Sequence, residues 1–174
     1  MTKKILVVVD YQKDFVDGSL GFDGARQLDD LIVQRIEQTL LEGGELVFTF
    51  DTHGADYLQT SEGRALPVPH CLRGSDGWQL FGRTAGYLPR ASRIFEKETF
   101  GSLELARYLA DGGYDEVELC GLVSNICVVS NALLAKAALP EARVVVCKDA
   151  TASADAAAHE AALSVMRSVF CEVL

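Results

Sequence analysis

Short apolar runs alternate along the chain with segments in which apolar residues recur every three or four positions. The runs are rich in β-branched residues and apolar at successive positions, which is typical of strands buried on both faces of a sheet. The spacing of the other segments is that of amphipathic helices. The predicted strands are residues 5–9, 46–50, 93–95, 116–122, 143–147 and 170–174, and the predicted helices lie within 28–41, 103–109, 131–138 and 156–169. This alternation predicts an α/β fold whose mostly parallel sheet is covered by helices on both faces.

Polar residues indicate where the helices begin. Asp29 or Asp30 is a candidate N-cap for the first helix, because a short carboxylate can accept the free N–H groups of the first turn. For the same reason Ser102, and either Ser153 or Asp155, are candidate caps for later helices.

Segment 51–87 departs from the alternation. It is rich in glycine, proline and polar residues and has no regular hydrophobic period. An insertion of this length in a compact domain is usually functional, so we expect it to contribute to a site.

Composition limits the class of protein. A chain of 174 residues is expected to form a single domain, residues 1–174. The net charge is −9 without a basic cluster, which argues against nucleic acid or an anionic membrane as partner. The first apolar run is too short for a signal peptide, and no stretch approaches the ~20 apolar residues of a membrane span. Five cysteines without paired spacing indicate reduced thiols, so we expect a cytoplasmic protein.

Chemically active side chains follow several of the predicted strands. Asp10 follows the first, Lys97 the third, and Cys127 lies beyond the fourth, at the start of a helix. Ligands bind at the carboxyl ends of strands in open parallel sheets, so these residues should meet. The helix dipole and the lysine would favour a Cys127 thiolate, while the carboxylate moves the proton. Each residue also has a plain structural interpretation, as a strand-end polar group or a small buried cysteine.

A second group indicates a metal site. Asp51 and His53 are two positions apart at the end of the second strand, so their side chains point the same way. His70, with Glu62 as a possible fourth ligand, would complete a nitrogen and oxygen set suited to zinc, manganese or iron. The alternative interpretation is a pair of surface histidines in a polar loop.

Five segments carry these residues in order: 8–15 (VVDYQKDF), 50–53 (FDTH), 69–77 (PHCLRGSDG), 95–97 (FEK) and 121–128 (GLVSNICV). Together they resemble the motifs of the isochorismatase-like cysteine hydrolases, in particular those of the nicotinamidases. The resemblance implies a three-layer α/β/α, Rossmann-like fold with a six-stranded parallel sheet in the order 3-2-1-4-5-6. It also implies a homo-oligomer.

The same resemblance assigns roles to residues. It implies a catalytic triad and a metal site with one divalent ion, zinc first and manganese or iron as alternatives. It implies a cis peptide bond between Leu122 and Val123, which would direct the N–H groups of Val123 and Cys127 at an oxyanion. The implied triad is Cys127, Asp10 and Lys97, and the implied metal ligands are Asp51, His53 and His70.

The sequence therefore predicts a metal-assisted cysteine amidohydrolase that cleaves a small carboxamide to a carboxylate and ammonia through a thioester. The alternatives are a hydrolase of another amide or ureido compound, and a catalytically silent family member that binds a metal or small ligand.

Two departures from the nicotinamidases bear on the substrate. Pro67 stands where they commonly have a tryptophan, and the loop after Lys97 is shorter than theirs. Phe15 and Phe100 remain as candidate apolar walls of the substrate site, and Tyr57 or Trp78 could replace the tryptophan. These differences predict that nicotinamide is a poor substrate, because an aromatic wall contributes about 0.5–1.5 kcal/mol beyond simple burial.

Overall fold

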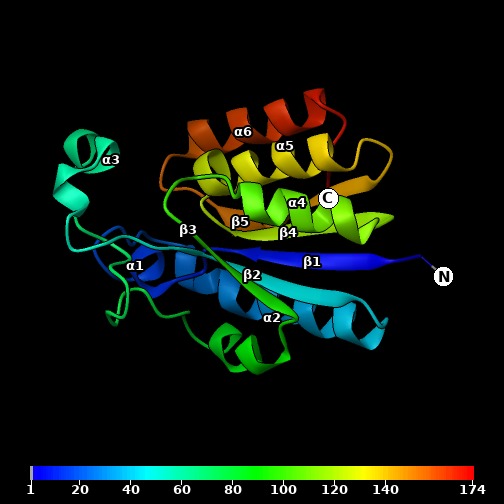
Figure 1. The fold of residues 1–174 in the computed structure, drawn as a ribbon, viewed down its shortest axis with the longest axis horizontal. Coiled ribbons are helices and arrows are strands. Elements are labelled where there is room, and N and C mark those ends of the chain that lie inside the picture. The colour runs from blue at the N-terminus through cyan, green and yellow to red at the C-terminus, as the bar shows by residue number, and fades with distance from the viewer. Residues whose placement is uncertain (1) are drawn as a thin grey trace.

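Six parallel strands form one sheet with helices on both faces in the computed structural model, which describes residues 2–174 (Figure 1). The sheet order is β3-β2-β1-β4-β5-β6, as the resemblance implied. The helices α4 (Leu103–Gly112), α5 (Val129–Ala138) and α6 (Ala156–Ser168) cover one face, and α2 (Leu28–Leu41) covers the other (Figure 1). The strands are β1 (Lys4–Val9), β2 (Glu45–Asp51), β3 (Arg93–Lys97), β4 (Glu116–Leu122), β5 (Arg143–Ala152) and β6 (Glu172–Val173).

Of the six α-helices in residues 2–174, four occupy the segments that the hydrophobic spacing predicts, and the two shortest, at residues 13–16 and 61–65, lie outside them. The α-helices are α1 (Lys13–Val16), α2 (Leu28–Leu41), α3 (Ser61–Ala65), α4 (Leu103–Gly112), α5 (Val129–Ala138) and α6 (Ala156–Ser168). Short 3₁₀ turns are η1 (Ala25–Gln27), η2 (Tyr57–Gln59) and η3 (Thr84–Arg90), and a π-helical turn, η4 (Ser124–Val128), leads into α5. No helix within residues 2–174 is long and apolar enough to cross a membrane.

Strand β1 shows why the strands are apolar throughout. Ile5, Val7 and Val9 pack into the core beneath α4, α5 and α6, while Leu6 and Val8 pack into the core beneath α2. Side chains alternate between the two faces of a strand, so a strand covered on both sides needs apolar residues at every position.

Two of the predicted helix caps are present and one is wrong. The Ser102 hydroxyl accepts the N–H of Leu105 at the start of α4, and Asp155 accepts two N–H groups at the start of α6. The N-cap position of α2 is Gln27, so neither Asp29 nor Asp30 caps this helix. The Asp29 carboxylate instead accepts the N–H groups of residues 83 and 84, which ties η3 to α2. The Asp29 carboxylate therefore binds residues more than fifty positions further along the chain, although its position in the sequence suggested a helix cap.

Apart from Asp51, the last residue of β2, segment 51–87 forms no strand and contains only short helical turns, as its lack of period indicated. It lies beyond the carboxyl ends of the strands, where α3 projects from one end of the molecule (Figure 1). Strand β5 runs five residues past its predicted end, because Thr151 and Ala152 pair with Gly121 and Leu122 after an irregularity in the ladder. This extension supports the end of β4, from which the turn η4 departs.

Candidate active site and metal centre

Three of the predicted residues meet at the carboxyl ends of β1, β3 and β4. Lys97 Nζ lies 2.5 Å from Asp10 Oδ2 and 3.6 Å from Cys127 Sγ. All three side chains are buried, with exposed fractions of 5% or less. The sheet order explains the meeting, since β1 is flanked by β2 and β4, and β3 lies directly beyond β2. A base, an ammonium group and a thiol are thus in mutual reach.

Asp10 is held by the neighbouring strand. Its backbone N–H donates to the carbonyl and hydroxyl oxygens of Thr49, and the Thr49 hydroxyl donates to Asp10 Oδ1 at 2.5 Å. Its φ of +43° turns the chain sharply out of β1. The Thr49 bond leaves Oδ2 facing Lys97, so one carboxylate oxygen is anchored and the other faces the reacting groups.

The environment sets the protonation states of the three groups. Burial raises the pKa of Asp10, although the Lys97 ammonium opposes this rise. Burial by itself would lower the pKa of Lys97, but the negative charges around it outweigh that effect and raise the pKa. Lys97 therefore stays an ammonium at neutral pH.

The prediction that Cys127 rests as a thiolate is wrong. Burial raises the pKa of this thiol well above its ordinary value of 9.0, and the negative charge of Asp10 raises it further. Lys97 opposes the rise without cancelling it. The helix start and the lysine together are weaker than burial beside a carboxylate, so Cys127 rests as a thiol.

The turn around Cys127 is fixed by several bonds. The Leu122–Val123 peptide bond is cis, as the resemblance implied, and the Val123 carbonyl accepts the N–H groups of residues 126 and 128. The Asn131 side chain donates to the Cys127 carbonyl at 2.8 Å. The hydroxyl of Ser124 lies 2.8 Å from His159 Nδ1 on α6, so this helix also holds the turn.

The predicted metal ligands converge beside this triad. Asp51 Oδ2 lies 3.0 Å from His53 Nε2 and 3.3 Å from His70 Nε2. Glu62 Oε1 lies 3.8 and 3.5 Å from the same two nitrogens, and the four ligand atoms all lie within 4.8 Å of one another. Two imidazoles and two carboxylates in this arrangement suit zinc, manganese or iron. The residues therefore fit a divalent cation.

Neighbouring groups orient these ligands. The Val68 carbonyl lies 2.8 Å from His70 Nδ1, which turns Nε2 toward the cluster. The Gln12 side chain accepts the N–H of Asp51 and donates to its carbonyl, so the end of β2 is clamped to the chain after β1. The ring of Tyr57 packs against both histidines and is buried. Tyr57 thus supports the cluster rather than forming an open wall.

A pocket of about 700 Å³ opens beside the metal cluster, where His53 and Glu62 line it, and it reaches Glu98 and Ile126, the chain neighbours of Lys97 and Cys127. Phe100 lies at its wall with 42% of its surface exposed. Phe15 does not line this pocket, because it is buried with its ring 5.5 Å from that of His70. Trp78 donates to the Thr52 hydroxyl and packs on Phe50. The pocket is lined by Thr52, His53, Gly54, Asp56, Thr60, Ser61, Glu62, Ala65, Leu66, Glu98, Thr99, Phe100 and Ile126.

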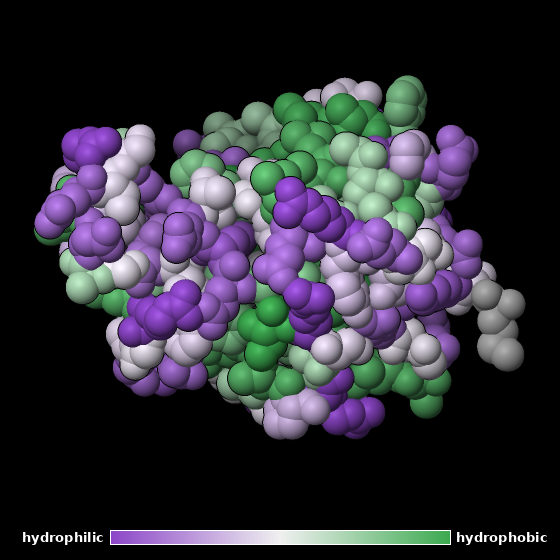
Figure 2. Space-filling view, viewed as in Figure 1, coloured by the Kyte–Doolittle hydropathy of each residue, from purple (hydrophilic) through white to green (hydrophobic). Residues whose placement is uncertain are grey.

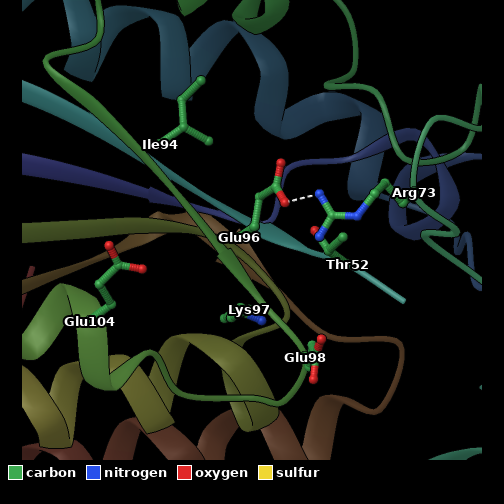
Figure 3. A pocket seen from close by; sticks show the side chains of 7 residues that line it. All are labelled: Thr52, Arg73, Ile94, Glu96, Lys97, Glu98 and Glu104. Atoms are coloured by element: carbon green, nitrogen blue, oxygen red, sulfur yellow. Dashed lines mark hydrogen bonds and ion pairs between the residues drawn. The ribbon is translucent and has the colours of Figure 1, made fainter. Parts of the chain in front are cut away.

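A second hollow of about 500 Å³ lies along β3 at the edge of the sheet (Figure 3). Arg73 is ion-paired with Glu96 across it (Figure 3). Lys97 and Glu98 also border this hollow, and Glu98 lines the larger pocket as well. Glu98 therefore stands on the ridge between the two.

Sequence reasoning missed three supporting residues: Thr49, Gln12 and Asn131. Thr49 is a single polar residue within an otherwise apolar strand, whereas Asn131 follows another polar residue, Ser130; both are buried with their hydrogen-bond partners in the site. A buried polar group needs a partner, so the isolated polar residue in the apolar strand was an available signal for Thr49. Gln12 lies within the first motif but received no role.

Comparisons with known proteins agree with the fold and with the family that the motifs resemble. A family model described as the isochorismatase domain matches residues 4–174. The nicotinamidase/pyrazinamidase PncA from Bacillus subtilis is 31% identical over 99% of both chains, with a TM-score of 0.88. The pyrazinamidase of Pyrococcus horikoshii, solved in complex with zinc, is 26% identical over 99% of this chain and 98% of that one, with a TM-score of 0.86. PnC1 from L. infantum, solved in complex with nicotinate, is 27% identical over 99% of this chain and 92% of that one, with a TM-score of 0.85. No curated protein gives a significant match.

Proposed function

The chain belongs to the isochorismatase family and is related to the nicotinamidases, and from this premise we propose that it is a cysteine amidohydrolase. It cleaves a small carboxamide to a carboxylate and ammonia. The observation that carries the proposal is the position of Lys97 Nζ, 2.5 Å from Asp10 Oδ2 and 3.6 Å from Cys127 Sγ. A protein that only binds a ligand needs no buried base beside a thiol, so these distances disfavour a silent binding protein.

The first half of the reaction forms a thioester. Cys127 Sγ attacks the amide carbon while its proton passes to Asp10 Oδ2. The N–H groups of Val123 and Cys127 donate to the substrate oxygen as negative charge develops on it. Asp10 then gives the proton to the amide nitrogen, the C–N bond breaks, and ammonia leaves.

The second half hydrolyses the thioester. Asp10 takes a proton from water as the water oxygen attacks the carbonyl carbon, and the C–S bond breaks to release the carboxylate. The proton returns from Asp10 to the Cys127 sulfur, which restores the starting state. Lys97 keeps its charge throughout and stabilises the negative charge as it moves between the carboxylate and the sulfur.

The cofactor is one divalent metal ion, with zinc first and manganese or iron as alternatives. Asp51, His53, His70 and Glu62 would hold it. When bound, the ion supplies a positive charge that can polarise or orient a substrate heteroatom or a water molecule. The complex of the Pyrococcus horikoshii pyrazinamidase with zinc supports this choice of metal.

We further propose a homo-oligomer that acts in the cytoplasm on a small-molecule amide, with neither nucleic acid nor a membrane as partner. All five cysteines are free thiols, which suits a reducing compartment. Within the enzyme class, a ureido compound is the second candidate substrate, because the same attack and proton transfers cleave its C–N bond.

An ammonia-release assay on a panel of small amides tests the function. The panel includes nicotinamide, aliphatic amides and ureido compounds, each assayed with wild type, Cys127→Ala and Cys171→Ala. We expect wild type and Cys171→Ala to release ammonia equally, and Cys127→Ala to release none above background. Cys171 is the matched control because it is buried at the amino end of β6, away from the carboxyl ends of the strands. Equal ammonia release by Cys127→Ala would overturn the mechanism.

A further inference from the structure

The charged residues that line the large pocket are all acidic, apart from the histidine of the metal cluster. They are Asp56, Glu62 and Glu98, and no lysine or arginine lines the pocket. Glu62 belongs to the metal cluster, which leaves Asp56 and Glu98. Both are exposed, and neither has an ion-pair partner within residues 2–174. The rim of the pocket therefore carries two uncompensated negative charges.

Basic side chains of the neighbouring segments have other partners, as Lys97 has in Asp10 and Asp51. Arg73 is ion-paired with Glu96, and it points toward that residue and not toward Glu98 (Figure 3). Arg64 donates to the Gln59 carbonyl. Figure 2 shows that hydrophilic side chains predominate over α3 and the segments beside it.

The remaining wall of the pocket is apolar. Leu66, Phe100 and Ile126 come from three separate segments, and they are 38%, 42% and 39% exposed. The large apolar side chains on this rim would remain in contact with water unless a ligand covers them. Ile126 precedes Cys127 in the turn η4, so this wall includes a residue of the segment that carries the proposed nucleophile.

Resting on the function proposed above, we propose that the substrate is a carboxamide whose apolar chain ends in a positively charged group. The chain lies against Leu66, Phe100 and Ile126, and the cation lies near Asp56 and Glu98. An amide that carries a carboxylate is repelled by the same two residues. Every hydrolysis produces a carboxylate, so the acidic rim also favours release of the product.

Three amides of similar length test the charge preference: the amide of ε-aminocaproic acid, caproamide, and the monoamide of adipic acid. They carry a positive, a zero and a negative charge at the far end. Two carboxylates near the surface should favour the cation over the anion by about tenfold in kcat/KM at low salt, with caproamide between them. The preference should shrink toward unity at about 1 M salt, where charges are screened within about 3 Å.

Variants separate this local effect from the charge of the whole molecule. Glu98→Gln and Asp56→Asn should each reduce the cation-to-anion ratio by about threefold. Asp111→Asn changes the net charge equally, but its exposed carboxylate lies at the far end of α4, so the ratio should not change.

The outcomes distinguish the two proposals. If wild type cleaves none of the wider amide panel in a Cys127-dependent way, the proposed function fails, and this inference fails with it. If amides are cleaved but the charged and neutral amides react equally, or Asp111→Asn has the same effect as Glu98→Gln, only the charge preference is overturned.

Discussion

At the scale of single residues, the site is a set of buried charges that depend on one another. Lys97 contacts Asp10 at 2.5 Å and Asp51 at 3.4 Å, so one ammonium serves both the triad and the metal cluster. A buried ion pair is useful when both partners are present, and removing one leaves an uncompensated charge. Asp10 therefore has a structural role in addition to its proposed role as base.

The pH dependence of alkylation tests the state of Cys127. The thiolate is the species that reacts with iodoacetamide, and the pKa of this thiol is raised well above 9.0. The thiolate fraction should then rise about tenfold per pH unit from pH 7 to pH 9. Labelling rates followed by peptide mass spectrometry measure this slope at each cysteine. A rate at Cys127 that is flat over this range would mean that the resting group is already a thiolate.

Asp10→Asn should separate turnover from thiol reactivity. Loss of the base should reduce kcat by about 10²–10⁴-fold. The negative charge of Asp10 raises the pKa of Cys127, so removing it should lower that pKa and make alkylation at pH 7 faster than in wild type. The free energy of unfolding should fall by about 3–5 kcal/mol, because Lys97 loses its close partner. Steady-state kinetics measure kcat, alkylation rates measure the reactivity of Cys127, and denaturant titration measures the free energy of unfolding. Slower alkylation of Cys127 than in wild type would contradict this account.

At the scale of elements, irregular segments carry most of the chemistry while strands and helices hold them. The insertion 51–87 supplies His53, Glu62 and His70, and the turn η4 supplies Cys127. Asn131 joins these parts, because its amide donates to the carbonyls of Cys127 and Phe100. Helix α5 thus ties the nucleophile to the loop that borders the pocket.

Metal binding should depend on the insertion. His53→Ala and His70→Ala should each lose divalent metal binding, since each removes one of the nitrogen ligands. Elemental analysis after reloading with zinc, manganese or iron measures the stoichiometry, expected to be one ion per chain in wild type. Metal should also raise the melting temperature of wild type but not of either variant. His159→Ala is the matched control, because that histidine lies on α6 and contacts Ser124. Absence of metal from carefully reloaded wild type would contradict the assignment.

His159→Ala should retain metal and still turn over more slowly. Without the bond to Ser124, the turn that presents Cys127 loses one of its supports. Misplacing a nucleophile affects kcat more than substrate binding, so we expect kcat to fall by about tenfold with KM little changed. His159→Asn offers an amide in the same region and should recover part of the rate. A change in KM alone, or no rescue by asparagine, would point to a purely structural effect.

At the scale of the whole molecule, the sheet order brings the site together. Chain order reverses between β1 and β4, and the carboxyl ends at this point carry Asp10 and the turn η4. Open parallel sheets bind ligands at this position because the loops diverge there. Strands β1 and β4 approach each other closely at Gly121, where an added Cβ would lie 2.0 Å from the Val9 carbonyl oxygen.

Gly121→Ala should therefore disrupt the sheet and not only the site. The backbone φ of +106° is unfavourable for alanine, and the methyl group would collide with backbone of β1. We expect a loss of more than about 3 kcal/mol in unfolding free energy, or failure to fold. Gly86→Ala is the control, because a methyl group added there would meet no atom within 4 Å, and it should be nearly neutral. Urea titrations measure the free energy of unfolding of the two variants. Comparable values would contradict the close approach of Gly121 to β1.

Much of the fold and the candidate reacting groups follow from the sequence, because both depend on local patterns. Buried strands and amphipathic helices have their own hydrophobic periods, which placed β1 to β4 and α2, α4 and α6 close to their observed bounds. The motifs placed Asp10, Lys97 and Cys127 in order along the chain, and the structure brings them into contact.

The tertiary structure decided whatever depends on several distant segments at once. The raised pKa of the Cys127 thiol results from burial beside Asp10, which no spacing within one helix reveals. Asp29 contacts η3 instead of capping α2, and Phe15 packs behind His70 instead of lining the pocket. The acidic and apolar sides of the pocket likewise combine residues from separate segments. Desolvation and charge interactions act through space, so they are set only when the chain is folded.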